Sequence, residues 1–457
     1  MENTLHKSAE IASVPYARLE KLAPRPVKIE DTGLSDTFLA DLIAKHLLEG
    51  GVLSMSELVG RMALAGSILE NVLFFMRQES RIEVKGPANA KSQTNLRYAL
   101  TDRGRNDALD AMQRSGYVGP APVPLEDYKR VITAQTVHGC SVDRADMERA
   151  FDGVILREEL LEQLGPSMNS GRAIFIYGPA GTGKTYITQK LVNLFPDLTL
   201  VPHAIAVNET VIEVFDPTLH RKAELDSPQP NLMLGSGHDP RFACCHRPVV
   251  ISGGELTADM LEVHFDPARR QYIAPLQLKA NNGVFIIDDM GRQRVAPETV
   301  FNRWIVPLEE QKDYLSLGAG RHFSVPFDVV LIFSTNLHPL DLADEAFLRR
   351  IGYKIEFPHL QREEFAAVWN QYCAANDIAC PEPVLDFVFT ELYGKDQRPM
   401  LPCHPRDLLS IAVDRAIYEG GDRQVAPEHL AWAWGSYFVS MNPGDVARLE
   451  PSTDGGQ

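Results

Sequence analysis

Residues 178–185 combine the residue types and the spacing needed to bind a chain of phosphate groups. They fit the pattern G-x-x-x-x-G-K-[ST], in which small residues let several backbone N–H groups point toward one anion. The lysine of such a loop reaches the β- and γ-phosphates, and the hydroxyl that follows it is a ligand for Mg²⁺. The residues of the pattern are Gly178, Pro179, Ala180, Gly181, Thr182, Gly183, Lys184 and Thr185. We therefore expect this chain to bind ATP with Mg²⁺.

The segments on either side of this loop support the interpretation. Residues 173–177 are apolar and partly β-branched, which predicts a buried strand, and residues 186–194 predict a helix that ends before Pro196. A strand, a glycine-rich loop and a helix in this order are the context that the motif requires. The alternative, an ordinary glycine-rich turn, does not need these flanks.

A second apolar run ends in two carboxylates. Residues 283–287 predict a buried strand, and Asp288 and Asp289 follow it directly. The first carboxylate would hold Mg²⁺, and the second would act as a general base on the attacking water. A third run, residues 329–335, delivers Asn336 at its end, where ligands bind in open α/β sheets. We expect Asn336 to share the water with Asp289.

Two arginines, Arg349 and Arg350, follow a short predicted helix and precede another strand. Taken in order, the segments 178–185, 286–289, 334–336 and 347–351 resemble the first nucleotide motif, the second nucleotide motif, sensor 1 and the arginine finger of the AAA+ ATPases.

The resemblance implies that one of the two arginines enters the site of a neighbouring subunit, which requires a ring, and we expect a hexamer. It also implies that Arg406 is the sensor 2 residue that reaches the γ-phosphate. A solvated helix end is the alternative for Arg349 and Arg350, and an ordinary arginine near a helix start is the alternative for Arg406.

Further features resemble one branch of that family. An insert at residues 252–279 and a predicted β-hairpin at residues 314–325 are similar to those of the branch that contains the MoxR-like ATPases. Tyr272, or Phe265 near it, is then a candidate contact with a protein substrate, and simple packing is the alternative. Most relatives have glutamate at the position of Asp289, so the shorter carboxylate predicts slow turnover or a scaffold that binds nucleotide with little hydrolysis.

The chain divides into six predicted segments. They are a flexible tail (1–33), a winged-helix-like domain (34–115), a proline-rich linker (116–125), an AAA+ core (126–358), a helical lid (359–442) and a second flexible tail (443–457). The fold class is α/β, with the parallel sheet of a P-loop NTPase. Its strands are expected to begin at Ile174, Val249, Val284, Val329 and Tyr353.

The N-terminal domain is predicted from three helices, two strands joined by a turn at residues 86–94, and a closing helix. Winged-helix domains bind either DNA or other proteins. Residues 34–115 contain ten basic and ten acidic residues, whereas a reader of duplex DNA is usually strongly basic. This balance favours docking to a protein, and an ATP-switched DNA-binding regulator remains the alternative.

Composition limits the class of protein. The 457 residues carry a net charge of −16, which argues against binding to nucleic acid or anionic membrane over the whole surface. No apolar run approaches the ~18 residues that cross a bilayer, and the start lacks the apolar core of a signal peptide, so we expect a cytoplasmic protein. Six cysteines suit a reducing compartment. Because Cys244, Cys245 and Cys403 lack paired C-x-x-C spacing, we expect free thiols rather than zinc ligands.

Overall fold

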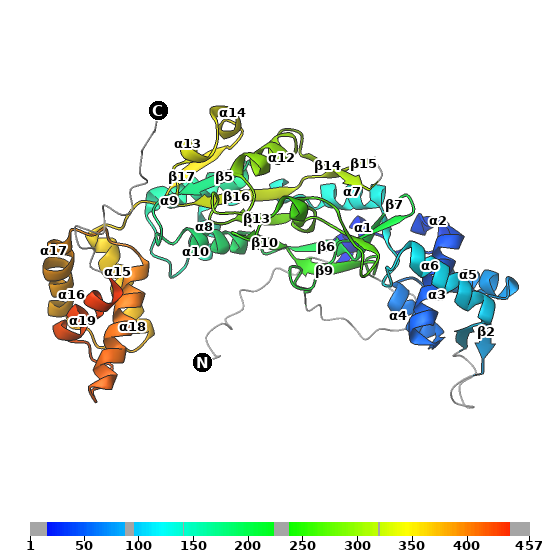
Figure 1. Ribbon diagram of the computed structural model, residues 1–457, viewed down its shortest axis with the longest axis horizontal. Coiled ribbons are helices and arrows are strands. Elements are labelled where there is room, and N and C mark those ends of the chain that lie inside the picture. Colours follow the sequence, from blue (N-terminus) through cyan, green and yellow to red (C-terminus); the bar gives the residue numbers. More distant parts are fainter. Residues whose placement is uncertain (1–15, 87–95, 140, 224–236, 319, 439–457) are drawn as a thin grey trace, which may run out of the picture. The chain divides into compact units, whose positions relative to one another are not determined.

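The computed structural model describes residues 16–86, 96–139, 141–223, 237–318 and 320–438 (Figure 1). The chain forms two compact units. The first contains residues 1–150, 163–176 and 188–354, and the second contains residues 151–162, 177–187 and 355–457. The predicted acid pair belongs to the first unit, and the predicted phosphate loop belongs to the second.

A five-stranded parallel sheet has the order β10-β13-β16-β5-β17. Strands β13 and β16 are buried along their whole length, as expected for parallel strands that are covered on both faces. Strand β13 pairs in parallel with both β10 and β16. The α/β fold class is confirmed, and all five strands lie where the sequence predicts them. They are β5 (Ile174–Tyr177), β10 (Val249–Ser252), β13 (Gly283–Ile287), β16 (Val329–Thr335) and β17 (Tyr353–Glu356).

Aromatic side chains hold α12 (Pro297–Glu310) on this sheet. The ring of Trp304 lies 5.6 Å from that of Phe285 in β13, and the ring of Phe301 stacks at 4.2 Å on Phe347 of α14 (Glu345–Leu348). The helix that precedes the two arginines therefore belongs to the same core as β13. We call residues 116–358 the central region. Its other described helices are α7 (Leu125–Ala134), η1 (Val137–Gly139), α8 (Arg144–Ala150), α9 (Glu158–Asn169), α10 (Lys184–Lys190), η2 (Leu191–Leu194), η3 (Ala258–Leu261), α11 (Leu276–Lys279) and α13 (Pro339–Leu342).

Short strands form additional β-structure that the sequence predicted only in part. A second five-stranded sheet has the order β11-β12-β8-β7-β4, and β6 pairs with β9. The predicted hairpin before β16 is confirmed, as antiparallel strands β14 (Lys312–Leu317) and β15 (Arg321–Pro326). Its residues Leu315 and Phe323 share a buried cluster with Ile205 and Ile212. The remaining strands are β4 (Val123–Pro124), β6 (Leu198–Pro202), β7 (Ala204–Val207), β8 (Thr210–Glu213), β9 (Phe242–His246), β11 (His264–Asp266) and β12 (Gln271–Ile273).

The insert at residues 252–279 contributes the hairpin β11–β12 to this second sheet. Phe265 and Tyr272 face each other across the hairpin, with ring centroids 5.0 Å apart, and Phe265 is 43% exposed. In this structure the insert is therefore sheet-bound, and its two aromatic rings pack on each other.

Residues 34–115 contain the elements that the sequence predicts, plus one short strand. They are α3 (Asp36–Gly50), β1 (Val52–Ser54), α4 (Met55–Met62), α5 (Gly66–Gln78), β2 (Ile82–Lys85), β3 (Arg97–Leu100) and α6 (Asp102–Arg114). The sheet order is β1-β3-β2. The predicted capping box at Ser54 is present, since its N–H donates to Glu57 Oε2 at 2.7 Å. The turn predicted between β2 and β3 lies, at residues 87–94, outside the described residues.

No single helix among the described residues is long and apolar enough to cross a bilayer. Helices α4 and α5 pass such a test only as a pair, bent by 111°.

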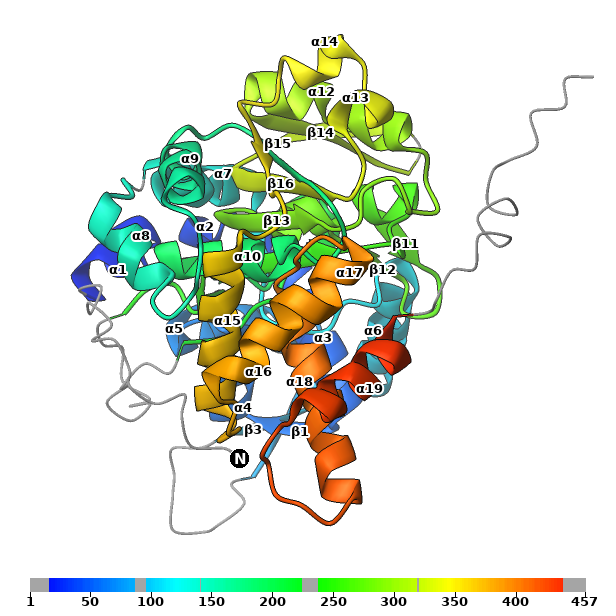
Figure 2. The ribbon, with the colours of Figure 1, turned by 90° about the vertical axis from the view of Figure 1, so that its left-hand side faces the viewer.

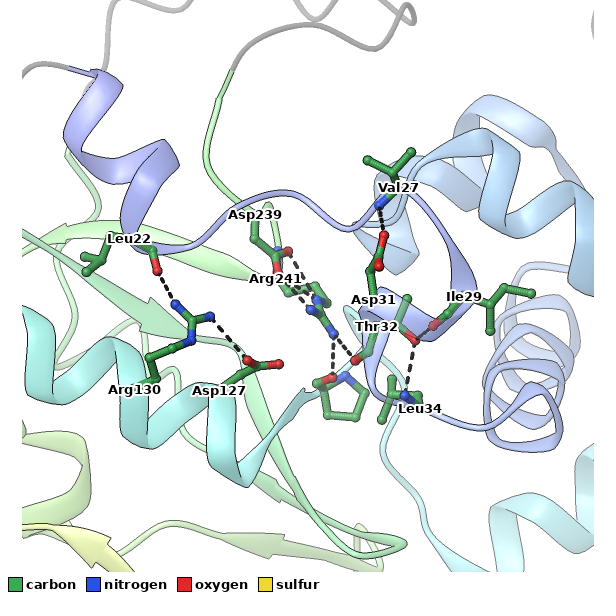
Figure 3. Close-up of polar contacts among 11 residues, drawn as sticks. Leu22, Val27, Ile29, Asp31, Thr32, Leu34, Asp127, Arg130, Asp239 and Arg241 are labelled. Carbon is green, nitrogen blue, oxygen red and sulfur yellow. Dashed lines mark hydrogen bonds and ion pairs between the residues drawn. The ribbon is translucent and has the colours of Figure 1, made fainter.

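Residues 16–33 are not a flexible tail, so this part of the prediction is wrong. They form α1 (Tyr16–Leu22) and α2 (Ile29–Thr32), and Leu19 is buried against residues of the central region. Arg130 donates to Leu22 O at 2.7 Å (Figure 3). Asp239 N donates to Ala23 O at 2.8 Å. The partners of this short segment lie more than 100 positions away in the sequence, where a local pattern does not reveal them. The predicted tails at residues 1–15 and 443–457 lie outside the described residues.

The segments on either side of residues 34–115 are also held by hydrogen bonds. Arg241 is 2% exposed and pairs with Asp239, and its Nη1 donates to Thr32 O at 2.9 Å and to Pro122 O at 3.3 Å (Figure 3). These two carbonyls belong to the chain that enters and the chain that leaves the N-terminal domain. On the other side, Lys45 donates to Tyr117 O. One buried guanidinium thus joins both connections of the domain.

The C-terminal region is helical, as predicted (Figure 2). A buried cluster that includes Phe365, Trp369, Leu408 and Trp434 holds its helices together. They are α15 (Arg362–Ala375), α16 (Glu382–Phe387), a π-helical segment (Val388–Tyr393), α17 (Gly394–Asp396), α18 (Cys403–Tyr418) and α19 (Pro427–Tyr437).

Candidate functional site: a phosphate loop and an acid pair

The predicted phosphate loop joins β5 to α10, and three of its glycines have left-handed backbone. The φ angles are 141° at Gly178, 82° at Gly181 and 83° at Gly183, a region that other residues rarely adopt. A Cβ at Gly178 would come within 2.3 Å of Phe357 O, and a Cβ at Gly181 within 2.9 Å of Cys403 Sγ. At Gly178 both the backbone angle and the nearby Phe357 carbonyl require glycine, and at Gly181 the backbone angle favours it.

Lys184 is the first residue of α10 and is buried, with 6% of its surface exposed. Its Nζ donates to Gly178 O and to Pro179 O, at 2.8 Å each. The Thr182 hydroxyl donates to Pro179 O at 2.9 Å. The ammonium group thus lies over the loop that precedes it, where it would meet a phosphate chain bound by the loop.

The start of α18 lies against this loop within the second unit. Besides Cys403, Leu401 Cδ1 would lie 3.2 Å from a Cβ at Gly181. Arg406, on the first turn of α18, is exposed, and its Nε donates to Asp407 Oδ1 at 2.8 Å. This hydrogen bond raises the pKa of Arg406. The predicted sensor 2 residue is therefore on a helix whose N-terminal end packs on the phosphate loop.

The acid pair and the predicted sensor amide meet in the first unit. Asn336 Nδ2 donates to Asp289 Oδ1 at 2.8 Å, which joins the end of β16 to the end of β13. Backbone contacts reinforce this junction, since Met290 N donates to Ser334 O at 2.8 Å and Thr335 Oγ1 donates to Met290 O at 2.7 Å. Asp289 has φ of 53°, a left-handed conformation that aspartate tolerates better than most residues.

Gln293 takes part in this turn, and no motif of the sequence indicated it. Its Nε2 donates to Asp288 O at 2.9 Å, and its Oε1 accepts from Gly291 N at 2.7 Å. The side chain therefore closes the turn that carries both carboxylates. A glutamine five positions after an acid carries no recognisable pattern, so only the folded turn reveals it.

The two arginines differ in their surroundings. Arg350 Nε donates to Glu309 Oε1 at 2.6 Å, and its Nη1 donates to Ala346 O. Arg349 is exposed, and within the described parts of the chain its guanidinium has no hydrogen bond or ion pair. Of these two side chains, only that of Arg350 is held by partners among the described residues.

A second unpredicted feature, the ion pair of Arg157 with Glu364, joins the segment before α9 to the C-terminal helices. Arg157 Nε and Nη2 donate to the two oxygens of Glu364 at 2.6 and 2.8 Å, and Nη2 also donates to His359 O. The hydrogen bond to Glu364 raises the pKa of Arg157. Such bidentate pairs are the strongest class of charge-assisted hydrogen bond.

The residues present fit a nucleoside triphosphate with Mg²⁺. The glycine-lined loop leaves its backbone free of side chains, and Lys184 adds a positive charge. Thr185 supplies a hydroxyl and Asp288 a carboxylate, the oxygen ligands that Mg²⁺ takes in proteins.

Comparisons with known proteins give weak similarities. Residues 361–436 match a family described as a domain of unknown function (DUF8689). No curated protein matches the chain. Among solved structures, NtrX from Brucella abortus has 14% identity and a TM-score of 0.39, and the match covers 65% of this chain and 59% of NtrX.

NtrX from the same organism in complex with ADP has 14% identity and a TM-score of 0.37, and the match covers 75% of this chain and 68% of the NtrX chain. The RuvB Holliday junction branch migration motor from Thermotoga maritima has 11% identity and a TM-score of 0.34, with coverage of 64% and 68%. At this level of identity, a likeness of structure is no evidence of a shared activity.

Proposed function

We propose that this protein binds and hydrolyses ATP. The observation that carries the proposal is the pairing of two built features: a loop of left-handed glycines closed by Lys184, and a general-base candidate, Asp289, held by Asn336. The two sets of residues follow one another along the chain in the order in which the AAA+ ATPases carry them. We therefore assign both sets of residues to one reaction.

In this mechanism each residue has one role. The loop N–H groups and Lys184 position the phosphates, and Asp289 accepts a proton from the attacking water while Asn336 holds its carboxylate in place. When bound, Mg²⁺ neutralises charge on the phosphates, and Thr185 and Asp288 are the residues that would hold it. Arg406, on the helix that packs on the loop, is the proposed contact to the γ-phosphate.

The proposal includes a ring, with a hexamer as the expected form, in which Arg349 acts on the nucleotide of the next subunit. The structure supports Arg349 rather than Arg350, because Arg350 is held by Glu309 and Ala346. An arginine supplied by a neighbour stabilises transition-state charge. The AAA+ resemblance of the motifs, including the MoxR-like features, is part of the same proposal.

The proposed role of the ring is to remodel or activate a protein partner that docks on the winged-helix-like domain. Two of the basic residues near its strands are already paired: Arg81 is buried and bound to Asp41 and Asp107, and Lys85 is bound to Glu83. These charges are therefore committed within the domain, which favours a protein partner over DNA. Duplex binding that weakens steeply with salt would favour the DNA-binding regulator instead.

Steady-state release of phosphate from ATP tests the proposal. We expect wild-type protein to release phosphate and Asp289→Asn to lose about 100-fold or more of that rate, because general-base catalysis typically contributes ~10²–10⁴-fold. Asparagine also tolerates the left-handed backbone of residue 289, so the turn is preserved. A wild-type protein that binds ATP without releasing phosphate would instead be a nucleotide-binding scaffold.

A further inference from the structure

Two cysteines of the C-terminal region are held together at the end of α15. Cys373 lies in the last turn of the helix and is 8% exposed, whereas Cys380 lies beyond it and is partly exposed. Cys380 packs against the buried cluster that contains Cys373 and Trp369. The indole N–H of Trp369, one turn before Cys373, donates to Cys380 Sγ at 3.2 Å. Both sulfurs therefore sit on one face of α15.

The loop between the two cysteines is fixed by its backbone. Ile378 N donates to Cys373 O at 3.0 Å, which turns the chain back over the helix end. Ala379 then exchanges two backbone hydrogen bonds with the chain before α19, to Arg423 O and from Val425 N, at 3.0 Å each. The position of Cys380 beside Cys373 is thus set by the fold.

The pKa values of the two thiols are shifted in opposite directions. The side chain of Cys373 lowers the pKa of Cys380, and that of Cys380 raises the pKa of Cys373. Burial raises the pKa of Cys244 to about 11 and of Cys245 to about 12, and it also raises the pKa of Cys403. Of the five cysteines that the structure describes, Cys380 alone has a lowered pKa, and the thiolate is the reactive form.

We propose that Cys380 and Cys373 form a modification site at which a peroxide-class oxidant converts the dithiol to a disulfide. The Cys380 thiolate attacks one peroxide oxygen, an S–O bond forms, the O–O bond breaks, and the departing hydroxide takes a proton to give water. The Cys373 sulfur then loses its proton and attacks the Cys380 sulfur, so that the S–S bond forms and the sulfenic oxygen leaves as a second water. Two thiols and one hydrogen peroxide give one disulfide and two waters.

Peptide mapping of the full chain tests this site. The protein is treated with hydrogen peroxide at neutral pH, quenched with acid, unfolded and alkylated with iodoacetamide. Trypsin then releases residues 363–395 as one peptide that contains only these two cysteines, and residues 396–406 as a peptide that contains only Cys403. We expect the disulfide in the first peptide to form about tenfold faster than Cys403 is oxidised. The disulfide-containing peptide is not alkylated, and its mass is two hydrogens lower than that of the dithiol.

Two serine variants define the roles. In Cys373→Ser, Cys380 should stop at the sulfenic acid and be captured by dimedone. In Cys380→Ser, Cys373 should stay a free thiol during peroxide treatment, so that iodoacetamide then alkylates it. The proposal is overturned if Cys373 and Cys380 of the wild-type protein are alkylated as fully as Cys403, or if the disulfide forms at the same rate as oxidation of Cys403. Because the assay reads thiols and not turnover, its outcome is independent of the proposed ATPase.

Discussion

At Asp289 the backbone adopts a left-handed conformation while its carboxylate accepts a hydrogen bond from Asn336. Strained residues that are fixed by several surrounding contacts are common at functional sites. Here the fixing contacts come from two strand ends and from Gln293, which bonds to Asp288 O and Gly291 N. The orientation of the proposed base thus depends on a glutamine that lies outside the acid pair.

Gln293→Ala removes both of these hydrogen bonds and tests that dependence. We expect kcat to fall about tenfold while nucleotide Kd stays within about twofold, because the turn would sample orientations in which Asp289 cannot hold the water. Phosphate release and an equilibrium titration measure the two quantities. Gln293→Glu is the matched control, since it keeps the acceptor for Gly291 N and should retain more activity. A variant in which kcat is unchanged would contradict a positioning role.

Among the elements, the parallel sheet was the easiest to predict and the added β-structure the hardest. Strands β13 and β16 are continuous apolar runs because both of their faces are buried. By contrast, β4 has two residues and pairs with β7, about 80 positions later, and β6 pairs with β9 beyond residue 240. Such short strands depend on distant partners, so local periodicity does not reveal them.

The buried pair of Arg241 and Asp239 ties the segments on either side of residues 34–115 to the rest of the first unit. Arg241→Met leaves the 3%-exposed Asp239 without its partner, which typically costs ~3–5 kcal/mol. We expect amide hydrogen exchange in residues 116–124 to accelerate by about 100-fold or more, because local opening becomes cheaper. The double variant Arg241→Met with Asp239→Leu removes the unpaired charge and should recover most of the protection. Unchanged exchange in the single variant would show that the pair does not hold the linker.

For the molecule as a whole, the central proposal is a reaction shared between subunits. The sequence motifs indicated the phosphate loop, the acid pair and both arginines by type and spacing. Which arginine is available was not predictable, because the answer depends on Glu309, a residue of α12 about 40 positions earlier. The same holds for residues 16–33, whose helices are stabilised by contacts with the central region.

Mixing two inactive variants tests the shared reaction. Arg349→Ala lacks the proposed trans-acting group, and Lys184→Ala lacks the phosphate contact. We expect each alone to be inactive and a mixture to recover part of the phosphate release, because some interfaces combine an intact loop with an intact Arg349. Arg350→Ala should behave as the less affected comparison. A mixture with no more activity than its components, together with a wild-type rate per subunit that does not depend on protein concentration, would contradict action in trans.

The most direct test of the account is an equilibrium titration of ATP against wild-type protein and against Lys184→Ala. Removing a charged contact to phosphate typically costs ~1.5–3 kcal/mol, so we predict that Kd rises by about 10-fold or more in the variant. Lys190→Ala, a change at the other end of α10, should leave Kd within about twofold of the wild-type value. Equal ATP affinity in wild-type protein and Lys184→Ala would show that the loop at residues 178–185 does not bind the triphosphate.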